Sequence, residues 1–408
     1  MDKKRWTAIL LGEIILIAVC VVMLVVQIIK KNEYEKFEDR GVPRINISLN
    51  EVNLEEIKTG SKETKYDGNE LDLYNNGKIT RYDGVEIKGR GNSTWYYEQK
   101  SYQIKFSEKV DLFGMGKAKK WVLLSMYVDA SLVRDDVAFL LAEMIGEKNI
   151  SRGEFVEVYF DGEYEGLYYL MHKVEIDKYS VDLKNNKGVL FEIDNLRGDE
   201  ETYYKSYLGN KLILKDLVLE KTEKKDDVIE EFLTIYNEFE KVLESGDYNK
   251  VAEIIDLDSF VMYYLINEFS VNPDAYTTSL YLYRNDEEKI SFGPVWDFDY
   301  AFGNLEWKWQ KDENFFSPTE KEQNAQNNLI KLLLKIPGFY EKVANLFNEK
   351  IKDRKDFVVQ AINDRAEQII KAAKKNNSKW EVGSFENEIR YLIEWIEKRY
   401  DYEEKEYS

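Results

Sequence analysis

The segment from Gly293 to Asn304, GPVWDFDYAFGN, places two carboxylates one residue apart between a Gly-Pro turn and several aromatic residues. If the short apolar run before them is a strand, Asp297 and Asp299 point to the same side, because side chains alternate along a strand. A rigid carboxylate pair suits a hard cation with oxygen ligands, such as Mg2+. The alternative is an acidic loop capped by core aromatic residues, so the upstream segments decide between the two interpretations.

Composition limits the chemistry of the chain. Its 408 residues suffice for two lobes or two domains, and 44% of them are apolar. A net charge of −19 argues against nucleic-acid binding, which needs a positive surface. The single histidine, His172, excludes a His-rich metal site, and the single cysteine, Cys20, excludes an internal disulfide. Any activity therefore rests on carboxylates, Lys and Arg, hydroxyls and amides.

The N-terminus has the pattern of a membrane anchor. Basic residues at 3–5 precede a stretch at 7–29 that carries no charge between 14 and 26. Such a stretch is long enough to cross a hydrocarbon core of about 30 Å as a helix. A cleaved signal peptide is the alternative, but its apolar core would be shorter and a small-residue cleavage site would follow. The sequence predicts a cytoplasmic tail at 1–6, a single-pass anchor in the cell membrane, a stalk at 30–43 and an extracytoplasmic domain.

Beyond the stalk, the chain changes from strand patterns to helix patterns. Alternating or β-rich runs lie at 45–50, 85–88, 102–106 and 155–160, and Asp161-Gly162 indicates a hairpin turn. One amphipathic helix is predicted at 131–146, with Ser131 as N-cap and Gly146 as the C-terminal stop. Helical spacing then dominates at 226–244, 257–271, 327–334, 338–373 and 386–400, interrupted by a hairpin at 278–283 and 289–292. This pattern predicts an α+β fold with a β-rich N-lobe at 44–200 and a mainly helical C-lobe at 201–408.

A Gly-Arg-Gly turn provides the first group of candidate site residues. Gly89, Arg90 and Gly91 lie between two predicted strands, and Lys100 and Lys105 follow on the second strand. Glycines that flank an arginine can bring backbone amides and a guanidinium close to phosphate oxygens, and a lysine can add a point charge. The alternative is a hairpin with ordinary surface cations.

Further candidates follow along the chain. Asp135 and Asp136 open the predicted helix, where acidic residues ordinarily complement the helix dipole. His172 is interpreted as a locally packed hairpin residue rather than a catalytic base. Asp274 lies on a loop after the helix that Pro273 ends, ahead of the carboxylate pair. A phosphate-binding turn and lysine, a loop aspartate and a metal-binding aspartate follow one another in a protein kinase in the same order.

The motifs resemble those of the CotH family, atypical secretory-type kinases named for a bacterial spore-coat protein. The resemblance rests on four segments, taken in order, and covers roughly residues 45–400: Arg90-Gly91-Asn92-Ser93 with Lys100 and Tyr102, Gly166-Leu167-Tyr168, the Asp274 loop, and Trp296-Asp297-Phe298-Asp299. It implies an atypical protein-kinase-like fold. It also implies phosphate transfer from ATP to Ser or Thr of surface, envelope or spore-coat proteins, with Mg2+ or Mn2+.

The resemblance also assigns roles to individual residues. Asp297 would bind the metal, with help from Asp299 and Ser279, and Asp274 would be the second catalytic aspartate. The nucleotide-binding set would be Arg90, Asn92, Ser93, Lys100 and Lys105.

The chain departs from the family pattern at two positions. His172 stands where many members have Glu, and Ser279 stands about five residues after the loop aspartate, where Asn is expected. Both departures keep open a degenerate kinase fold that acts as a non-catalytic adhesion or scaffold protein. The 29 tyrosines favour that alternative, because Tyr is enriched at binding interfaces. A carboxylate-based glycosidase is the weakest alternative, since it gives the Gly-Arg-Gly turn no role.

Overall fold

A computed structural model describes residues 3–150, 152–183, 187–196, 198, 202–285, 288–304 and 328–408; the side chains of residues 3–13, 28–32, 93 and 328 lie outside the described part. The strands are β1 Arg44–Ser48, β2 Lys65–Asn75, β3 Lys78–Arg90, β4 Ser101–Asp111, β5 Lys117–Ser125, β6 Glu154–Phe160, β7 Glu163–His172, β8 Gly188–Ile193, β9 Tyr204–Lys205, β10 Lys211–Val218, β11 Leu280–Arg284 and β12 Ser291–Phe292. The helices are α1 Lys3–Tyr34, α2 Leu54–Thr59, α3 Arg134–Ile145, α4 Lys225–Ser245, α5 Tyr248–Ile254, α6 Leu257–Ser270, α8 Asn328–Leu333, α9 Phe339–Lys350, α10 Lys355–Trp380 and α11 Phe385–Glu406, with 3-10 turns η1 Ser93–Tyr96 and η4 Lys352–Arg354. This confirms the predicted α+β class.

The first half of the chain forms a closed sheet in the order β1-β2-β3-β4-β5-β7-β6, and a parallel pair of β1 and β6 completes the closure. Alternation along β7 divides the core into two parts. Tyr168 and Leu170 point to the interior of the closed sheet, whereas Leu167, Tyr169 and Met171 pack in the larger core shared with the helices. Because β7 contributes side chains to both cores, the closed sheet packs directly against the helices.

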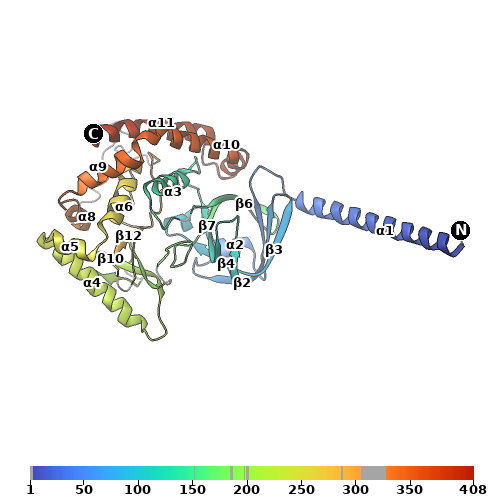
Figure 1. Ribbon diagram of the computed structural model, residues 1–408, viewed down its shortest axis with the longest axis horizontal. Helices are drawn as coiled ribbons and strands as arrows, with labels where there is room; N and C mark the ends of the chain where they lie inside the picture. Colours follow the sequence, from blue (N-terminus) through green and yellow to red (C-terminus); the bar gives the residue numbers. More distant parts are fainter. Residues whose placement is uncertain are drawn as a thin grey trace.

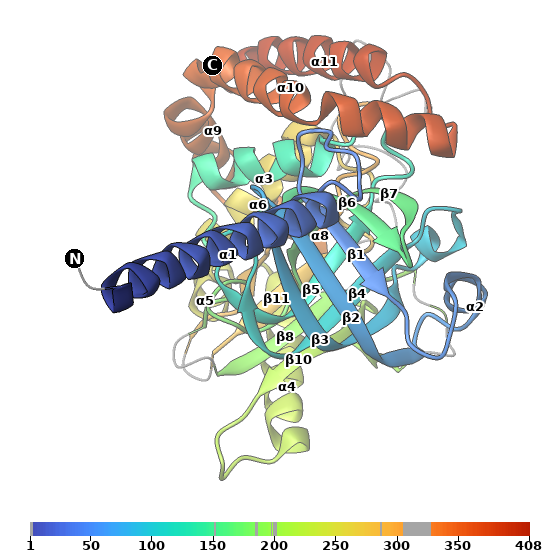
Figure 2. The ribbon, with the colours of Figure 1, turned by 90° about the vertical axis from the view of Figure 1, so that its right-hand side faces the viewer.

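A second sheet and the helices complete the body. The second sheet has the order β12-β11-β8-β10-β9, with β8 in its centre between β11 and β10. In both ribbon views α10 and α11 lie side by side along one edge, and α3 lies between them and the sheets (Figures 1 and 2). Helices α4 and α5 lie at the opposite end from α1 (Figure 1). The two sheets and the first turn of α3 surround the candidate site described below.

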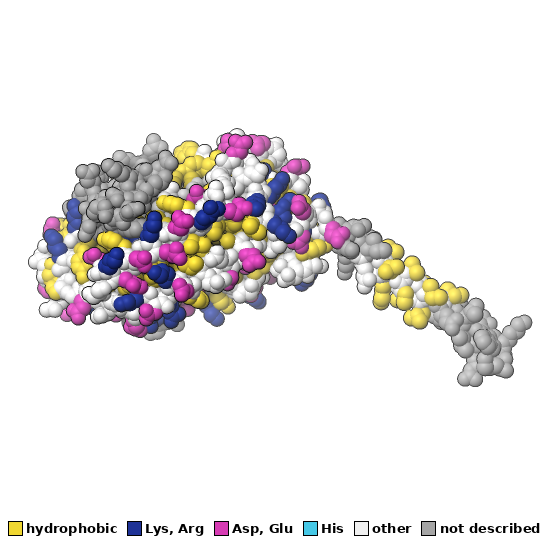
Figure 3. Space-filling view, turned by 90° about the horizontal axis from the view of Figure 1, so that it is seen from above, with side chains coloured by type: hydrophobic (Ala, Val, Ile, Leu, Met, Phe, Trp, Pro, Cys, Tyr) yellow, Lys and Arg dark blue, Asp and Glu magenta, His cyan; other side chains and the backbone are white. Residues whose placement is uncertain are grey.

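Helix α1 projects from the body, and its described middle part carries hydrophobic side chains (Figure 3). Among the residues whose side chains are described, no helix is both long enough and apolar enough to cross a membrane. The predicted anchor at 7–29 is therefore not supported, and the predicted tail at 1–6 has no described side chains. The segment after α1 packs on the closed sheet: Phe37 is buried against Tyr74 and Tyr159, and Arg40 forms an ion pair with Glu157 at 2.9 Å.

The acidic and basic side chains are interspersed over the face of the body shown in Figure 3.

Most predicted helices occur, but several bounds differ; α11, for example, runs to Glu406 instead of ending at residue 400. Ser131 is not the N-cap of α3; instead the carboxylate of Asp129 accepts the backbone N–H of Ser131 and of Arg134 at 2.9 and 3.0 Å. A carboxylate two residues earlier in the loop reaches those amides, and the Ser131 hydroxyl accepts the Val133 N–H at 3.4 Å instead. Gly146 ends α3 with a positive φ of 96°, as predicted. The helix predicted at 338–373 is two helices, α9 and α10, separated by the turn η4.

We expect Glu147→Gln to stabilise the fold above neutral pH. Glu147 is 8% exposed, its Oε1 accepts the Asn149 N–H at 3.3 Å, and its Oε2 has no hydrogen-bond partner among the described residues. Burial raises the pKa of Glu147 to about 7, against an unfolded value of about 4.3. The folded state therefore binds the extra proton, and stability falls as pH rises from about 4.3 to about 7.

The glutamine amide carries no charge at any pH, so the variant should not lose stability as the pH rises. Chemical denaturation at pH 8 should show Glu147→Gln more stable than the wild type by about 2 kcal/mol, and the two should be equal near pH 4. The exposed Glu253→Gln is the matched control and should change little at either pH. A difference between Glu147→Gln and wild type that does not depend on pH would contradict the argument.

Candidate functional site

A cavity of about 720 Å³ lies where the two sheets meet the start of α3. Its walls come from the β3–β4 turn, β4, the segment after β7, β8, β10, β11 and the loop at 293–304. The charged residues that line it are Lys62, Glu63, Lys88, Arg90, Asp135, Lys173, Glu192, Asp194, Lys215, Asp274, Asp297 and Asp299. Segments more than two hundred residues apart thus meet in one polar cavity.

The Gly-Arg-Gly turn is built so that only glycine fits on either side of the arginine. A Cβ on Gly91 would lie 1.8 Å from Thr94 Oγ1, and the residue has a positive φ of 97°. A Cβ on Gly89 would lie 2.4 Å from the ring of Trp95. Gly89 and Arg90 are the last residues of β3, paired with Tyr102 and Ser101 of β4, so the turn predicted around Arg90 begins only at Gly91.

Two predicted nucleotide-binding residues lie in this turn. Asn92 lines the cavity, and Lys62 Nζ fastens the turn by donating to Asn92 Oδ1 and to the Gly91 carbonyl, both at 2.9 Å. The side chain of Ser93 lies outside the described residues.

Arg90 connects the turn to the carboxylate segment. Its guanidinium lies over the Trp296 ring, 5.1 Å from the ring centroid, and lines the cavity. Burial lowers the pKa of Arg90, and Tyr281, Glu192 and Asp297 act in the opposite direction. An arginine stays charged at physiological pH even so, which makes this a fixed positive charge beside the carboxylates.

The segment around Asp297 is not a strand, contrary to the prediction, and Asp297 has a left-handed φ of 70°. Three contacts hold this conformation. The Ser279 hydroxyl donates to Asp297 Oδ2 at 2.7 Å, and Asn272 Nδ2 donates to the Asp297 carbonyl at 3.1 Å. The N–H of the next residue, Phe298, donates to Asp135 Oδ1 at 2.9 Å. Asp297 and Asp299 still line the same cavity, because the turn replaces the strand alternation that was expected.

The carboxylates raise one another's pKa values. Burial, and then Asp297 and Asp194, raise the pKa of Asp274 to about 7. Burial, and then Asp297 and Asp135, raise the pKa of Asp299 well above its usual range. Oδ1 of Asp299 is buried without a hydrogen-bond partner among the described residues. A bound cation would satisfy that oxygen and relieve the repulsion.

The donor set fits a hard divalent cation in part. All candidate ligands are oxygens, as Mg2+ prefers, yet no group of three or more Asp, Glu, His or Cys in the described part of the chain is arranged to hold a metal. Mg2+ commonly takes one or two carboxylates and completes its shell with water and substrate phosphates. The site therefore fits a cation that arrives with a phosphate-bearing substrate better than a permanently held one.

Comparison with protein families agrees with this geometry. The family model described as CotH kinase protein matches residues 87–402, which is most of the chain. The chain belongs to the CotH kinase family. The match spans the Gly-Arg-Gly turn, the loop aspartate and the carboxylate pair, and so confirms the resemblance inferred from the motifs. No curated protein matches it.

The two lysines predicted to face phosphate do not line the cavity of this CotH domain. Lys100 Nζ instead donates to the carbonyls of Trp95 and Tyr97 at 2.5 and 3.2 Å. These hydrogen bonds stabilise the turn between β3 and β4. Lys105 lies further along β4 and pairs with Glu86 at 3.5 Å. Local spacing from the turn suggested both lysines. Carbonyls of the turn hold Lys100, whereas Lys105, although on the same face of β4 as Gln103, lies further along the strand beside Glu86.

Several cavity residues of the CotH domain were missed by the sequence analysis. Lys173 follows the end of β7, and Lys215 on β10 pairs with Glu192 on β8 at 2.7 Å. The signal for β8 was present in Glu192-Ile193-Asp194, a second pair of carboxylates one residue apart on a β-rich run. Those two side chains reach the same cavity from one strand face.

The departure at His172 does not affect the cavity. Its Nδ1 bonds the Tyr179 carbonyl at 2.8 Å, and its ring packs edge-on against Trp121 at 4.2 Å. His172 does not line the cavity, so it has a packing role, as the sequence analysis expected.

Proposed function

We propose that this protein transfers the terminal phosphoryl group of ATP to Ser or Thr hydroxyls of a protein substrate, with Mg2+ or Mn2+. The observation that carries the proposal is the convergence of Arg90, Asp274, Asp297 and Asp299 on one cavity beside a glycine-flanked turn. In this proposal the closed sheet is the N-lobe, the segment after residue 200 is the C-lobe, and the cavity lies between them. Phosphoryl transfer needs mainly positioning and charge neutralisation, which these groups supply.

Each residue has a separate task. Asp297 and Asp299 would hold the cation, which would neutralise charge on the phosphates. Arg90 would bind a phosphate oxygen from the turn side. Asp274 would accept the proton as the acceptor O–H bond breaks, the hydroxyl oxygen forms a bond to phosphorus, and ADP leaves. A carboxyl with a pKa of about 7 suits a base that works near neutral pH.

In this proposal Lys173 or Lys215, which line the cavity, takes the phosphate-binding role first assigned to Lys100. Lys173 lines the cavity, and burial lowers its pKa, with Glu175 opposing. Lys215 is held by the buried Glu192. The Lys215–Glu192 pair matches the need of kinases for a lysine fixed by a carboxylate near the phosphates.

Thermal unfolding of the full chain with a non-hydrolysable ATP analogue tests the site directly. Analogue and Mg2+ together should raise the melting temperature, because a ligand at about 100 times its Kd stabilises by roughly 2.7 kcal/mol. Arg90→Ala should remove most of that shift, whereas the exposed Arg81→Ala on the same strand should keep it. No shift with either Mg2+ or Mn2+ would contradict nucleotide binding.

A further inference from the structure

Asp135 lies at the start of α3 and reaches the carboxylate segment from outside it. It is 6% exposed, lines the cavity, and its Oδ1 accepts the backbone N–H of Phe298 at 2.9 Å. Phe298 is the residue between Asp297 and Asp299. One side-chain acceptor on a helix therefore fixes the backbone that carries both carboxylates.

The segment needs such a contact because its backbone is strained. Asp297 has φ of 70° and its partner Ser279 has φ of 55°, both in the left-handed region. A non-glycine residue in that region is strained and persists only where surrounding contacts hold it. The contacts from Asn272 and Ser279 act on Asp297 itself, whereas Asp135 acts on the next peptide group. Among the described residues, Asp135 is the acceptor that connects the Phe298 amide to α3.

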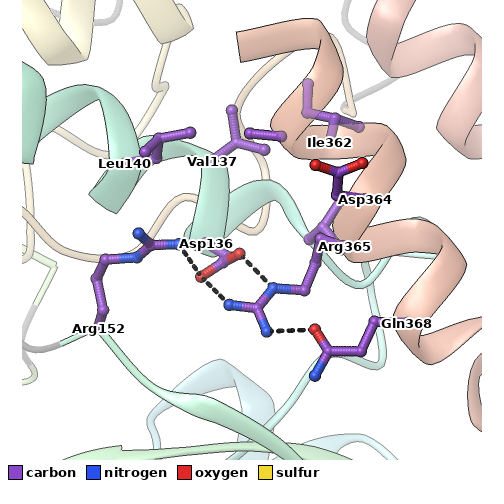
Figure 4. A pocket seen from close by; sticks show the side chains of 10 residues that line it. Asp136, Val137, Leu140, Arg152, Ile362, Asp364, Arg365 and Gln368 are labelled. Atoms are coloured by element: carbon purple, nitrogen blue, oxygen red, sulfur yellow. Dashed lines mark hydrogen bonds and ion pairs between the residues drawn. The ribbon is translucent and has the colours of Figure 1, made fainter. Parts of the chain in front are cut away.

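The start of α3 is itself fixed on its other side (Figure 4). Asp136, next to Asp135, accepts Arg365 Nε from α10 at 2.9 Å, Arg152 at 3.4 Å and the Tyr169 hydroxyl at 2.8 Å. The adjacent carboxylates thus point to two different structures, one to the cavity loop and one to α10. An ion pair with the buried Asp136 resists rotation of the first turn, so Asp135 is presented from a rigid base.

We propose that Asp135 is a positioning residue that holds the peptide group between Asp297 and Asp299, with α3 fixed against α10 by the Asp136–Arg365 ion pair. Its significance for catalysis rests on the proposed function. Its role is to accept the Phe298 N–H. The amide oxygen of asparagine can also accept that hydrogen bond, whereas the methyl group of alanine cannot.

Two variants separate this role from a role for the charge. Asp135→Asn keeps an oxygen for the Phe298 N–H, and Asp135→Ala removes it. Amide hydrogen exchange of the full chain should show peptides that contain 296–300 exchanging at least tenfold faster in Asp135→Ala and within about threefold of wild type in Asp135→Asn. The exposed Glu143→Gln on the same helix is the control and should leave that segment unchanged. Exchange elsewhere in α3 and α6 reports whether the variants remain folded.

Kinetics of phosphate transfer form the second arm. Asp135→Ala should lower kcat by about ten- to a hundredfold with KM for ATP within threefold, and Asp135→Asn should restore most of kcat. Equal losses in both variants would show that the charge matters, as for a direct cation ligand, and would overturn the positioning role. Unchanged exchange at 296–300 in Asp135→Ala would also overturn it. Absence of transfer by the wild type would refute the proposed function, and the exchange arm would still decide the role of Asp135.

Discussion

Asp297→Ala should abolish phosphate transfer, with a fall in rate of at least about a thousandfold. Asp297 interacts with several other cavity residues. The Ser279 hydroxyl donates to its carboxylate at 2.7 Å, Arg90 lowers the pKa of Asp297, and Glu192 and Asp194 raise it. If it holds the cation beside the phosphates, removing it removes both the ligand and the neutralisation of charge that phosphoryl transfer requires. The measurement is the initial rate of phosphate incorporation into an acceptor protein at saturating ATP and Mg2+.

Stability should not account for that loss. Burial raises the pKa of Asp297, so its negative charge is unfavourable there. Removing it offsets the loss of the Ser279 hydrogen bond, and the variant should unfold within a few degrees of the wild type without ligand. The exposed Asp353→Ala is the matched control and should retain full rate. A rate within tenfold of wild type for Asp297→Ala would place the cation elsewhere.

Asp274→Asn should lower kcat by about a hundred- to ten-thousandfold while nucleotide binding remains. Asp274 lines the cavity from the loop after α6, and among the described residues no side chain donates a hydrogen bond to its carboxylate. An unengaged carboxylate with a pKa of about 7 is suited to accept a proton from a substrate hydroxyl. The amide keeps the shape of the side chain but cannot accept that proton.

The measured quantities for Asp274→Asn are kcat, KM for ATP, and the ligand-induced rise in melting temperature. The rise should be within a few degrees of wild type, which separates a chemical role from a binding role. The unliganded variant should also be more stable than wild type at pH 8, because Asp274 with its raised pKa loses stability as pH rises towards about 7. Loss of nucleotide binding together with rate would instead make Asp274 a cation ligand.

Alternation and helical spacing predicted most of the fold because each element buries one face. β4 is an example: Tyr102 and Ile104 point into the closed sheet, and Ser101 and Gln103 line the cavity. The period-2 pattern was visible in the sequence because one side of the strand is apolar. The closure of the sheet by β1 and β6 was not, since pairing between distant strands leaves no local signal.

Site residues that belong to short sequence motifs could be predicted, whereas those brought to the cavity by tertiary packing could not. Arg90, Asp274, Ser279, Asp297 and Asp299 meet in the cavity as their motifs indicated. The strand expected at the carboxylate pair is a left-handed turn, because tertiary contacts hold a backbone that spacing rules do not foresee.

The lysines show the same limit. Lys100 lies near the turn in sequence, but its ammonium group is taken up by carbonyls of the turn itself. Lys173, just after β7, and Lys215 on β10 reach the cavity from segments that follow much later. Sequence distance from a motif is therefore a poor guide to which cation faces the phosphates. The membrane anchor was likewise inferred from one apolar stretch, and the described part of the chain does not support it.

Intact mass spectrometry of the purified full chain, incubated with ATP, Mg2+ or Mn2+ and a Ser-rich acceptor protein, tests the central claim most directly. Phosphotransfer predicts mass increments of about 80 Da on the acceptor or on the chain itself, absent in Asp297→Ala and present in Asp353→Ala. No increment with either cation, together with no stabilisation by nucleotide, would contradict the claim. The protein would then be a non-catalytic member of the CotH kinase family.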